Sequence, residues 1–410
     1  MNRIEKLIQE LCPNGVPFEK INALVEKVDT VDWQTTESAR YIDLATVDPR
    51  TSSLGDTDVI TEKTAPSRAR QAVAVGDVLF GSTRPLQGRR FFVDEVAALP
   101  FIASTGYTVL RVNSPKLDPR FLFHWLGTSS FVQHVEACQQ GTSYPAISDK
   151  NVKRALIPVP PIEVQREIVK ILDLFTELEA ELEAELEDRR KQYEYYRDQL
   201  LTFPEEGGAT WVELGEIAAI DRGNGMPRTM LTQTGVGAIH YGQIYTYYGP
   251  VARETISFVT AGDAKKLTVV EPGELIITNT SENLEDVCST VAWLGKEPIV
   301  IGGHSSVIRS SMDPRFLAYW FRSTNFFPQK HKLATGAKVV DISANKLKKV
   351  VLPVPPIEVQ REIADVLDKF DAFVNDLSSG LPAEIEARRK QYEYYRDKLL
   401  TFKELQPEAA

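Results

Sequence analysis

The strongest constraint on the fold of this 410-residue chain is that its sequence contains one plan twice. The run PVPPIEVQREI at residues 158–168 recurs unchanged at residues 353–363, an offset of 195 positions. The run RRKQYEYYRD at residues 189–198 recurs at residues 388–397, an offset of 199 positions, so the second copy has gained four residues between the two runs. Identical runs of this length are not produced by shared composition, and they indicate an internal duplication.

The sequence between the repeated runs has diverged. Residues 19–117 and 212–312 share only a thin skeleton. Residues 65–70 (APSRAR) and residues 238–248 (AIHYGQIYTYY) have no counterpart in the other copy. We infer that the repeated segments meet the same partner twice, whereas the variable segments meet two different targets.

The repeated segments predict long amphipathic helices. Apolar residues recur every three or four positions from Ile168 and again from Ile363, which is the spacing of a coiled-coil stripe. The run LEAELEAE at residues 178–185 advances by fours, as in a stutter. We expect a central helix over residues 162–203, roughly 63 Å long at 1.5 Å per residue, and a second helical region that breaks or kinks at residues 378–382. A helix of this length needs a partner, so we expect the two copies to pack as an antiparallel coiled coil.

The variable halves predict mixed α and β structure. Short β-branched runs bounded by glycine and proline indicate strands, of which the clearest are residues 72–80, 106–112, 267–270 and 275–278. In each half an Asp-Pro pair opens a short helix, with Asp118 or Asp313 as the N-cap and Pro119 or Pro314 at the first helical position.

The predicted fold class is α+β and internally duplicated. Two mixed α/β globular domains are separated by two long helices packed as an antiparallel coiled coil, in a pseudo-twofold, roughly circular arrangement. A small N-terminal amphipathic helix, carrying Ile4, Leu7, Ile8 and Leu11, is expected to pack near the distal helix. We divide the chain into a first globular domain with the N-terminal helix (1–157), a central repeated helix (158–203), a second globular domain (204–352), a distal repeated helical region (353–404) and a tail (405–410).

The charge is unevenly distributed. The formal net charge of −10 is unusual for a DNA-binding protein. However, residues 176–188 hold seven acidic residues and no basic one, whereas residues 62–92 hold six basic and two acidic residues. Residues 326–349 hold six lysines and one aspartate. Such stretches are more often solvated surface than binding sites, but the overall acidity does not exclude DNA.

Composition argues against a membrane or secreted protein. No apolar run approaches the roughly 20 residues of a membrane span, and the charged N-terminus lacks the apolar core of a signal peptide. Cys12, Cys138 and Cys288 are scattered, which suits a reducing compartment and excludes a disulfide framework. We expect a cytoplasmic protein without a metal site.

Familiar catalytic motifs are absent from the sequence. There is no GxxxxGK[ST] or GxGxxG phosphate loop, no HExxH or Cys/His metal spacing and no GxSxG nucleophile elbow. There is also no tetrapeptide resembling Asn-Pro-Pro-Phe or Asp-Pro-Pro-Tyr, with which amino-methyltransferases hold the target base. Each of the five isolated histidines (124, 134, 240, 304 and 331) is expected to be structural. The sequence therefore predicts a non-catalytic binding protein that holds no cofactor.

The repeated motifs resemble those of a known family. The two copies of PVPPIEVQREI, each running into a helix that ends in RRKQYEYYRD, resemble the specificity subunit of type I restriction–modification systems over essentially the whole chain. The resemblance implies two target recognition domains, each reading one half of a bipartite, asymmetric site in double-stranded DNA. It also implies two modification (methyltransferase) subunits docked on the helices and, in some complexes, restriction subunits. The methyl donor and ATP would bind to those partners.

Candidate DNA-binding residues come from the variable segments and the segments that follow them, because basic side chains bind phosphates and polar side chains read base edges. In the first half they are Arg68, Arg70, Ser82, Thr83, Arg84, Arg89, Arg90 and Tyr144. In the second half they are Arg228, Tyr241, Gln243, Tyr245, Asn279, Ser281, Asn283 and Lys338. The alternative for any one of them is ordinary surface or turn structure, and the resemblance carries none of them over.

The repeated tyrosine-rich run supplies candidate docking residues. Tyr193 and Tyr196 fall on the apolar stripe, so Tyr195 and Arg197 point elsewhere and could meet a methyltransferase subunit. Tyr394 and Arg396 are their equivalents in the second copy.

Two other functions stay open at the sequence level. The first is a coiled-coil adaptor that binds proteins and never DNA, for which two long unlike heads are unnecessary. The second is the recognition region of a self-contained modification enzyme, which would carry a catalytic tetrapeptide or a cofactor loop.

Overall fold

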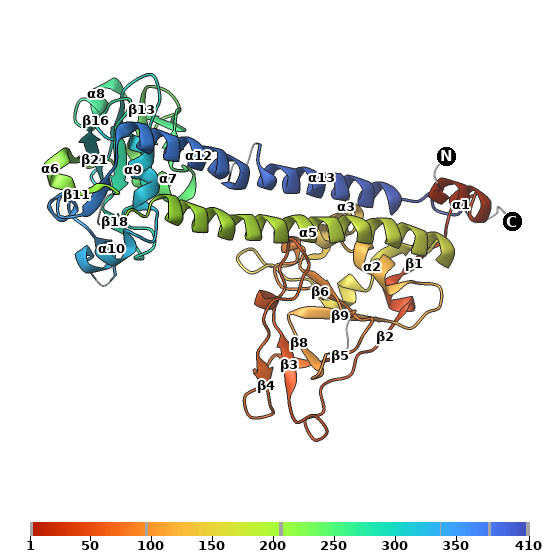
Figure 1. The fold of residues 1–410 in the computed structure, drawn as a ribbon. Helices are drawn as coiled ribbons and strands as arrows, with labels where there is room; N and C mark the ends of the chain where they lie inside the picture. The colour runs from red at the N-terminus through yellow and green to blue at the C-terminus, as the bar shows by residue number, and fades with distance from the viewer. Residues whose placement is uncertain (1–2, 95–96, 205–207, 337, 376–378, 407–410) are drawn as a thin grey trace. The chain divides into compact units, whose positions relative to one another are not determined.

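The computed structural model describes residues 3–94, 97–204, 208–336, 338–375 and 379–406. The chain forms two compact units, each of which is described by itself. The first unit comprises residues 1–184 and 384–410, and the second comprises residues 185–383. Each unit contains one globular head, the beginning of one repeated helical region and the end of the other (Figure 1).

The head of the first unit is built on two four-stranded sheets. The first sheet has the order β2 (Val25–Glu26), β9 (Tyr107–Val112), β6 (Val78–Gly81) and β7 (Arg90–Phe92). The second has the order β4 (Val59–Ile60), β3 (Ala39–Ile42), β8 (Phe101–Ser104) and β5 (Ala69–Val73). Among the described strands of these two sheets only β3 and β8 run parallel, and β1 (Phe18–Lys20) pairs antiparallel with β10 (Leu156–Pro158) in a separate two-stranded sheet.

The head of the second unit repeats this plan with more strands. Its first sheet has the order β12 (Ala218–Arg222), β21 (Ser305–Ser310), β17 (Leu275–Thr278), β19 (Thr290–Trp293) and β14 (Val251–Ala252). Its second has the order β15 (Ser257–Val259), β13 (Val236–Ile239), β20 (Ile299–Ile301) and β16 (Thr268–Val270). Two short pairs complete it: β11 (Thr210–Glu213) with β23 (Val351–Val354), and β18 (Thr280–Ser281) with β22 (Val340–Asp341).

Short helices join the strands in both heads. In the first unit they are η1 (Ile21–Ala23), η2 (Leu44–Thr46), η3 (Pro85–Gln87), α2 (Pro119–Trp125), α3 (Ser129–Cys138) and α4 (Asp149–Val152). In the second they are α6 (Leu214–Ile217), η4 (Arg228–Met230), α7 (Tyr241–Thr246), α8 (Ala261–Ala264), α9 (Pro314–Phe321), α10 (Phe327–Leu333) and α11 (Ala344–Leu347). The predicted N-caps are confirmed, because the Asp118 and Asp313 carboxylates accept hydrogen bonds from the second backbone N–H of α2 and α9.

The long helices are confirmed with one adjustment. The helix α5 covers Ile162–Leu200 rather than reaching residue 203. The distal region is broken, as predicted, into α12 (Ile357–Asn375) and α13 (Leu381–Leu399), although residue 378 of the predicted break lies outside the described residues. None of the helices among the described residues combines the length and the apolar character that a membrane crossing requires.

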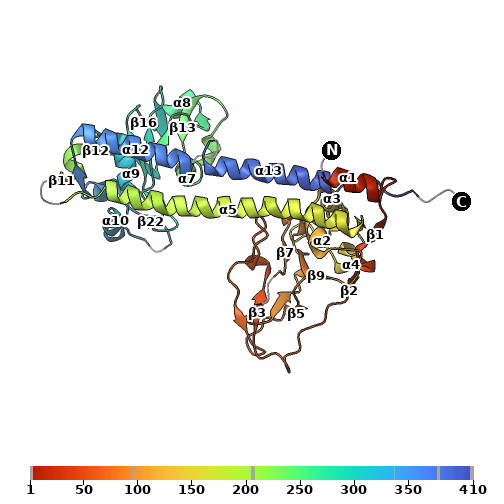
Figure 2. The same ribbon diagram turned by 45° about the vertical axis from the view of Figure 1, so that its right-hand side comes forward.

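The N-terminal helix lies at the end of the distal helix, as expected. The helix α1 covers Arg3–Leu11 and joins the core of the first unit through Ile4 (Figure 2). Directly after it, the Val16 N–H donates to the Lys403 carbonyl at 2.9 Å, and the Leu405 N–H donates to the Val16 carbonyl at 2.9 Å.

One predicted strand is two. Residues 72–80 supply the end of β5 and most of β6, which belong to different sheets. The chain turns at Gly76, whose φ of +89° lies in the region that favours glycine. The next residue, Asp77, is buried and forms two hydrogen bonds to the Arg111 guanidinium, at 2.9 and 2.7 Å. The apolar alternation that suggested a single strand therefore spans a turn closed by a buried ion pair.

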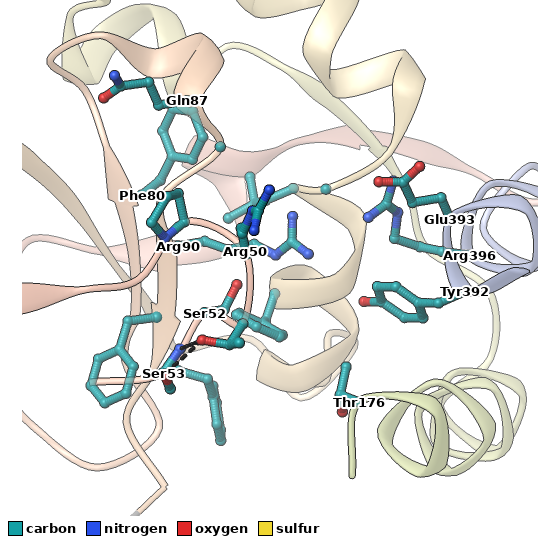
Figure 3. Close-up of a pocket in the computed structure, with 18 of the residues that line it drawn as sticks. Arg50, Ser52, Ser53, Phe80, Gln87, Arg90, Thr176, Tyr392, Glu393 and Arg396 are labelled. Carbon is teal, nitrogen blue, oxygen red and sulfur yellow. Dashed lines mark hydrogen bonds between the residues drawn. The ribbon is translucent and has the colours of Figure 1, made fainter. Parts of the chain in front are cut away.

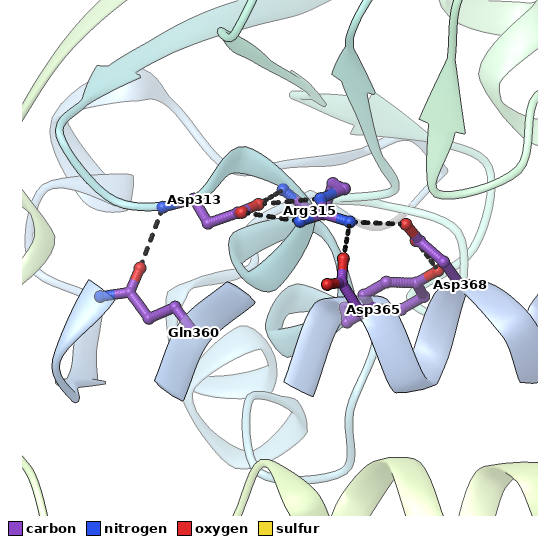
Figure 4. Close-up of polar contacts among 6 residues, drawn as sticks. Asp313, Arg315, Gln360, Asp365 and Asp368 are labelled. Carbon is purple, nitrogen blue, oxygen red and sulfur yellow. Dashed lines mark hydrogen bonds and ion pairs between the residues drawn. The ribbon is translucent and has the colours of Figure 1, made fainter. Parts of the chain in front are cut away.

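The repeated glutamine of PVPPIEVQREI fastens each long helix to its head. Gln165 is fully buried, accepts from the Asp118 N–H at 2.8 Å and donates to the Pro160 carbonyl at 2.7 Å. Gln360 makes the same bonds in the second unit, to the Asp313 N–H at 2.9 Å and to the Pro355 carbonyl at 2.7 Å (Figure 4). Part of the repeated sequence thus makes the same contacts inside each unit.

The end of each repeated region packs on the head of the other copy. In the first unit, the Asp397 carboxylate accepts from the Ser129 backbone N–H at 3.2 Å and from the Ser129 hydroxyl. In the second unit, Asp198 accepts from the Thr324 N–H at 3.3 Å and from the Thr324 hydroxyl at 2.7 Å. These four residues occupy equivalent places in the duplication, so both units share one head–helix joint.

Because a histidine is buried in this joint, we expect the stability of the first unit to depend on pH. His124 is fully buried, with Nε2 2.7 Å from Asp173 Oδ1 and Nδ1 3.0 Å from the Tyr392 hydroxyl. Burial, the largest effect, lowers the pKa of His124, although the Asp173 carboxylate partly opposes it. The folded unit therefore holds a neutral imidazole, whereas the unfolded chain takes up a proton near pH 6.5. We expect stability to fall by about 1–2 kcal/mol as the pH decreases from 7 to 5.

The duplication provides a control for this prediction. Tyr319 replaces His124 in the second unit and donates to Asp368 at 2.6 Å, and a phenol does not titrate between pH 5 and 7. Urea unfolding of the His124→Tyr variant should show a smaller loss over that pH range. An equal loss in the variant would show that other groups cause the pH dependence.

Candidate nucleic-acid interface

In the first head, three segments meet where the central strand β6 ends. The Ser82 N–H donates to the Gly106 carbonyl at 2.8 Å, which ties this strand end to the turn before β9. The Ile147 N–H donates to the Ser82 carbonyl at 2.9 Å, and Thr83 forms a β-bridge with Ala146. We call this assembly, residues 82–84, 105–106 and 141–147, the strand-end platform of the first head.

The platform brings several predicted residues together. Arg84 is exposed, and its guanidinium carbon lies 5.1 Å from the centre of the Tyr144 ring. Tyr144 is itself 73% exposed. The Arg68 carbonyl accepts from the Thr105 N–H at 2.9 Å, which places exposed Arg68 beside the same turn. Guanidinium groups and an exposed aromatic ring on one surface suit contacts with phosphates and bases.

The backbone at Arg84 is strained. Its φ of +49° is left-handed, which is costly for a residue with a Cβ. The Arg84 N–H donates to the Pro145 carbonyl at 2.7 Å, and this bond holds the strained residue against the neighbouring loop. The platform therefore presents Arg84 in a fixed position.

The second head carries the same platform with different side chains. The Asn279 N–H donates to the His304 carbonyl at 2.8 Å, and the Ile342 N–H donates to the Asn279 carbonyl at 2.8 Å. Thr280 pairs with Asp341, as Thr83 does with Ala146 in the first head. Residues 279–281, 303–304, 336 and 338–342 form this second strand-end platform.

Aromatic and imidazole rings gather on the second platform. The Tyr241 ring lies 4.6 Å from the His304 ring, and the His304 Nδ1 lies 2.8 Å from the Thr280 hydroxyl oxygen. The Tyr245 hydroxyl donates to the Thr280 carbonyl, and burial raises its pKa to about 12. Lys338 is exposed on the loop that leads to β22. Tyr241 and Tyr245 therefore lie at this platform and Lys338 lies on one of its loops, and their contacts with DNA stay a prediction.

His304 was not among the predicted interface residues. It is exposed in the turn before β21, at the position that Gly106 occupies before β9. In the sequence it is an isolated histidine, which we expected to be structural. Its place directly before a β-branched run is the signal that could have identified it.

Several predicted residues have internal roles. Asn279 is fully buried, and its amide donates to the Ile342 carbonyl while its oxygen accepts from Ser306. Ser82 and Ser281 are also buried. Gln243 caps α7 by accepting from the His240 N–H at 2.9 Å. These side chains support the platforms from inside, which corrects their prediction as direct DNA contacts.

Arg90 faces the helices instead of the platform. Its guanidinium carbon lies 5.2 Å from the Phe123 ring centre, and the pKa of Arg90 is lowered mainly by burial. Its neighbour Arg89 is half-buried and donates to Gln87. Arg70, Arg228 and Asn283 are exposed, although the Asn283 amide bonds to Asp286 and the Arg70 Nε donates to the Ser67 carbonyl at 2.8 Å.

The predicted docking residues divide in the same way. Tyr195 and Tyr394 are equivalent and are 60% and 61% exposed. Arg197 pairs with Asp198 at 3.0 Å, and Arg396 is buried over the Tyr392 ring at 5.3 Å. A partner can therefore reach the two tyrosines, whereas Arg197 is half-buried and Arg396 is buried; the docking role of all four residues stays a prediction.

The described residues contain no group of three or more histidine, cysteine, aspartate or glutamate side chains arranged to hold a metal ion. No metal chemistry is assigned to either platform.

Comparisons with known proteins agree with this architecture. A family model described as "Type I restriction modification DNA specificity domain" matches residues 51–188 and 208–387. The specificity subunit of the type I restriction enzyme EcoR124I/EcoR124II from Escherichia coli is 32% identical over 297 residues, covering 69% of this chain and 70% of that protein. A putative type I restriction enzyme specificity subunit from Haemophilus influenzae is 30% identical over 307 residues, covering 70% of this chain and 73% of that protein.

A solved structure extends the similarity to almost the whole chain. It belongs to work on the complex assembly and conformational transition of the type I R-M system, and it matches with a TM-score of 0.66 at 25% identity. The match covers 95% of this chain and 98% of the other.

Proposed function

Because this chain belongs to the family of type I restriction–modification DNA specificity subunits, we propose that it reads a bipartite, asymmetric DNA sequence, one half-site with each head. One observation carries the proposal: the two heads build the same strand-end platform from different side chains. The first platform presents Arg84 and Tyr144, whereas the second presents His304 and Lys338. The same backbone arrangement with different exposed side chains is suited to reading two different half-sites.

The exposed side chains of each platform are proposed to make the DNA contacts. A guanidinium such as that of Arg84 can donate two hydrogen bonds to a guanine edge, which gives specificity. Arg68, Arg70 and Arg228 are better placed to bind phosphates, which gives affinity without sequence preference.

We further propose that two methyltransferase subunits dock on the faces that carry Tyr195 and Tyr394, and that restriction subunits can join them. This chain would be non-catalytic and cytoplasmic and would bind no cofactor, because the partners would supply the methyl donor and ATP. Contacts within each unit support antiparallel packing of the repeated helices. For example, the Phe175 ring lies 5.6 Å from that of Tyr395, and Arg389 donates to Glu179 at 2.7 Å. The domain boundaries and the circular arrangement stay predictions.

A head exchange tests this function. Replacing residues 19–156 with the corresponding half of a relative should change one half-site and leave the other unchanged, because each head is fastened to the helices by its own joint. The measurement is sequencing of methylated bases in DNA modified by the complex of the variant with its methyltransferase subunits.

The matched control exchanges residues 212–351 and should change the other half-site. If either exchange alters both half-sites, or if both leave the DNA sequence unchanged in an active complex, the two-reader function is wrong.

A further inference from the structure

The first unit contains a cavity at its head–helix joint. The cavity has a volume of about 970 Å³ and is lined by the loop at residues 49–54, by β7, by α2 and α3, and by parts of α5 and α13. Arg90 enters it from the head, while Tyr392 and Arg396 project into it from α13 (Figure 3). Thr176 of α5 lies on the same wall.

Two of the guanidinium groups in this cavity, those of Arg90 and Arg396, have a buried N–H without a hydrogen-bond acceptor. Arg396 is only 9% exposed, and its Nε has no hydrogen-bond acceptor, because the nearest Asp397 oxygen is 3.6 Å away. The Nε of Arg90 is also buried without an acceptor. Arg90 and Arg396 lie close enough that each repels the charge of the other, and exposed Glu393 offsets this only partly.

The other carboxylates of the cavity are already engaged. Arg389 forms ion pairs with Glu179 at 2.6 Å and with Glu183 at 3.2 Å. Asp94 is paired with Arg120 at 2.8 Å. The cavity is therefore short of negative charge beside Arg90 and Arg396.

In the second unit, a carboxylate lies beside the equivalent tyrosine and guanidinium groups. Tyr193, Arg197 and Glu194 are equivalent to Tyr392, Arg396 and Glu393, but Asp371 stands at the position of Thr176. Burial, the largest effect, raises the pKa of Asp371, whereas the hydrogen bond from the Asn375 amide at 2.9 Å, the Arg322 guanidinium and the Tyr193 hydroxyl lower it. The carboxylate of Asp371 thus faces the tyrosine and the guanidinium of its own joint.

The contact between this repeated arginine and the aspartate that follows it in the sequence also differs between the units. The Arg197 Nε donates to Asp198 at 3.0 Å, whereas the equivalent Arg396 Nε has no acceptor. Arg322, like Arg90, leaves its Nε without an acceptor, so that feature is common to both units. What distinguishes the first unit is the missing carboxylate at residue 176 and the longer contact between Arg396 and Asp397, which leaves the Arg396 Nε without a hydrogen-bond acceptor.

We propose that the cavity of the first unit binds a phosphate-type oxyanion between Arg90 and Arg396, in place of the carboxylate that Asp371 supplies in the second unit. The two guanidinium groups would donate to its oxygens. The volume exceeds that of a single phosphate ion, so the phosphate of a small organic molecule such as a nucleotide also fits. The bound anion would stabilise the joint between the first head and the helices.

The test is a titration of the full chain with inorganic phosphate, with ionic strength held constant by chloride. Phosphate tenfold above its Kd should raise the Tm of the first unit by about 3–6 °C and broaden the phosphorus NMR signal. Adenosine monophosphate, titrated in parallel, distinguishes the sources: tighter binding assigns the cavity to organic phosphates, and weaker binding assigns it to the free ion.

Variants identify the site. Thr176→Asp should lose the phosphate response, because it supplies the carboxylate internally. The matched variant Thr176→Asn, of similar size without the charge, should keep the response, as should Ala184→Asp, which adds a charge on the exposed surface of the same helix. Asp371→Thr should create a second response in the second unit.

If Thr176→Asp does not fold, the variant Arg396→Gln serves as a second test. It should weaken phosphate binding at least tenfold. The proposal is overturned if wild type responds to phosphate no more than to chloride. It is also overturned if Thr176→Asp, or a folded Arg396→Gln, retains the wild-type response.

Discussion

Replacing Gly127 with arginine is expected to destabilise the first unit by about 3–5 kcal/mol, because it adds a second guanidinium where one already lies. A Cβ at Gly127 would overlap the Arg90 guanidinium, which occupies the space that this glycine leaves open. The new side chain would therefore have to displace Arg90 or bury an unpaired charge.

The second unit indicates how this loss can be reversed. There, Arg322 stands at the position of Gly127, and its guanidinium donates to the Thr290 carbonyl at 2.7 Å. Thr290 is the strand partner of Ile277, as Arg90 is of Phe80. Each head thus supplies one guanidinium to its joint beside the repeated tyrosine, from a different place in the chain. The double change Arg90→Thr with Gly127→Arg should regain most of the stability that Gly127→Arg removes.

Amide hydrogen exchange across α2 and α9 measures this prediction, because the two helices report on the two joints separately. Protection of α9 should stay unchanged in every first-unit variant. If the double variant is as unstable as Gly127→Arg alone, the two guanidinium groups are not interchangeable.

Much of the fold could be predicted because it depends on local patterns. The Asp118 and Asp313 caps, β17 at Leu275–Thr278 and the break after α12 follow from residue types at fixed spacing, and the structure has them at the predicted places. The duplication also fixed which helices to expect. The single strand expected over residues 72–80 failed because a glycine turn interrupts the apolar run without changing its composition.

The candidate interface was harder to predict because it depends on contacts between distant segments. Asn279 and Lys338 are both polar residues of the second half. In the structure, Asn279 is fully buried and bonded to Ile342 and Ser306, whereas Lys338 is exposed. Arg84 and Arg90 are six residues apart but face different surfaces, since one lies in a left-handed turn and the other in a strand. No local pattern distinguishes these cases.

Inserting one further Leu-Glu-Ala-Glu after Glu185 is expected to lengthen the unread DNA between the half-sites by one or two base pairs. The acidic run is continuous helix within α5, so four residues add about 6 Å. Base pairs are about 3.4 Å apart, so translation alone corresponds to nearly two of them. Rotation favours one: four residues turn a helix by about 40° beyond a full turn, close to the twist of one base pair.

The insertion point leaves the joints of both units intact, because it follows the residues of α5 that contact the first head and precedes those that contact the second. Glu179 and Glu183 keep their ion pairs with Arg389, and Asp198 keeps Thr324. Both half-site sequences should therefore be unchanged while only their separation grows. The matched control Glu181→Gln alters the charge of the run at an exposed position without altering its length, and should leave the spacer unchanged. Methylation mapping decides the question: an unchanged spacer in a folded, active insertion variant would show that this helix does not set the distance.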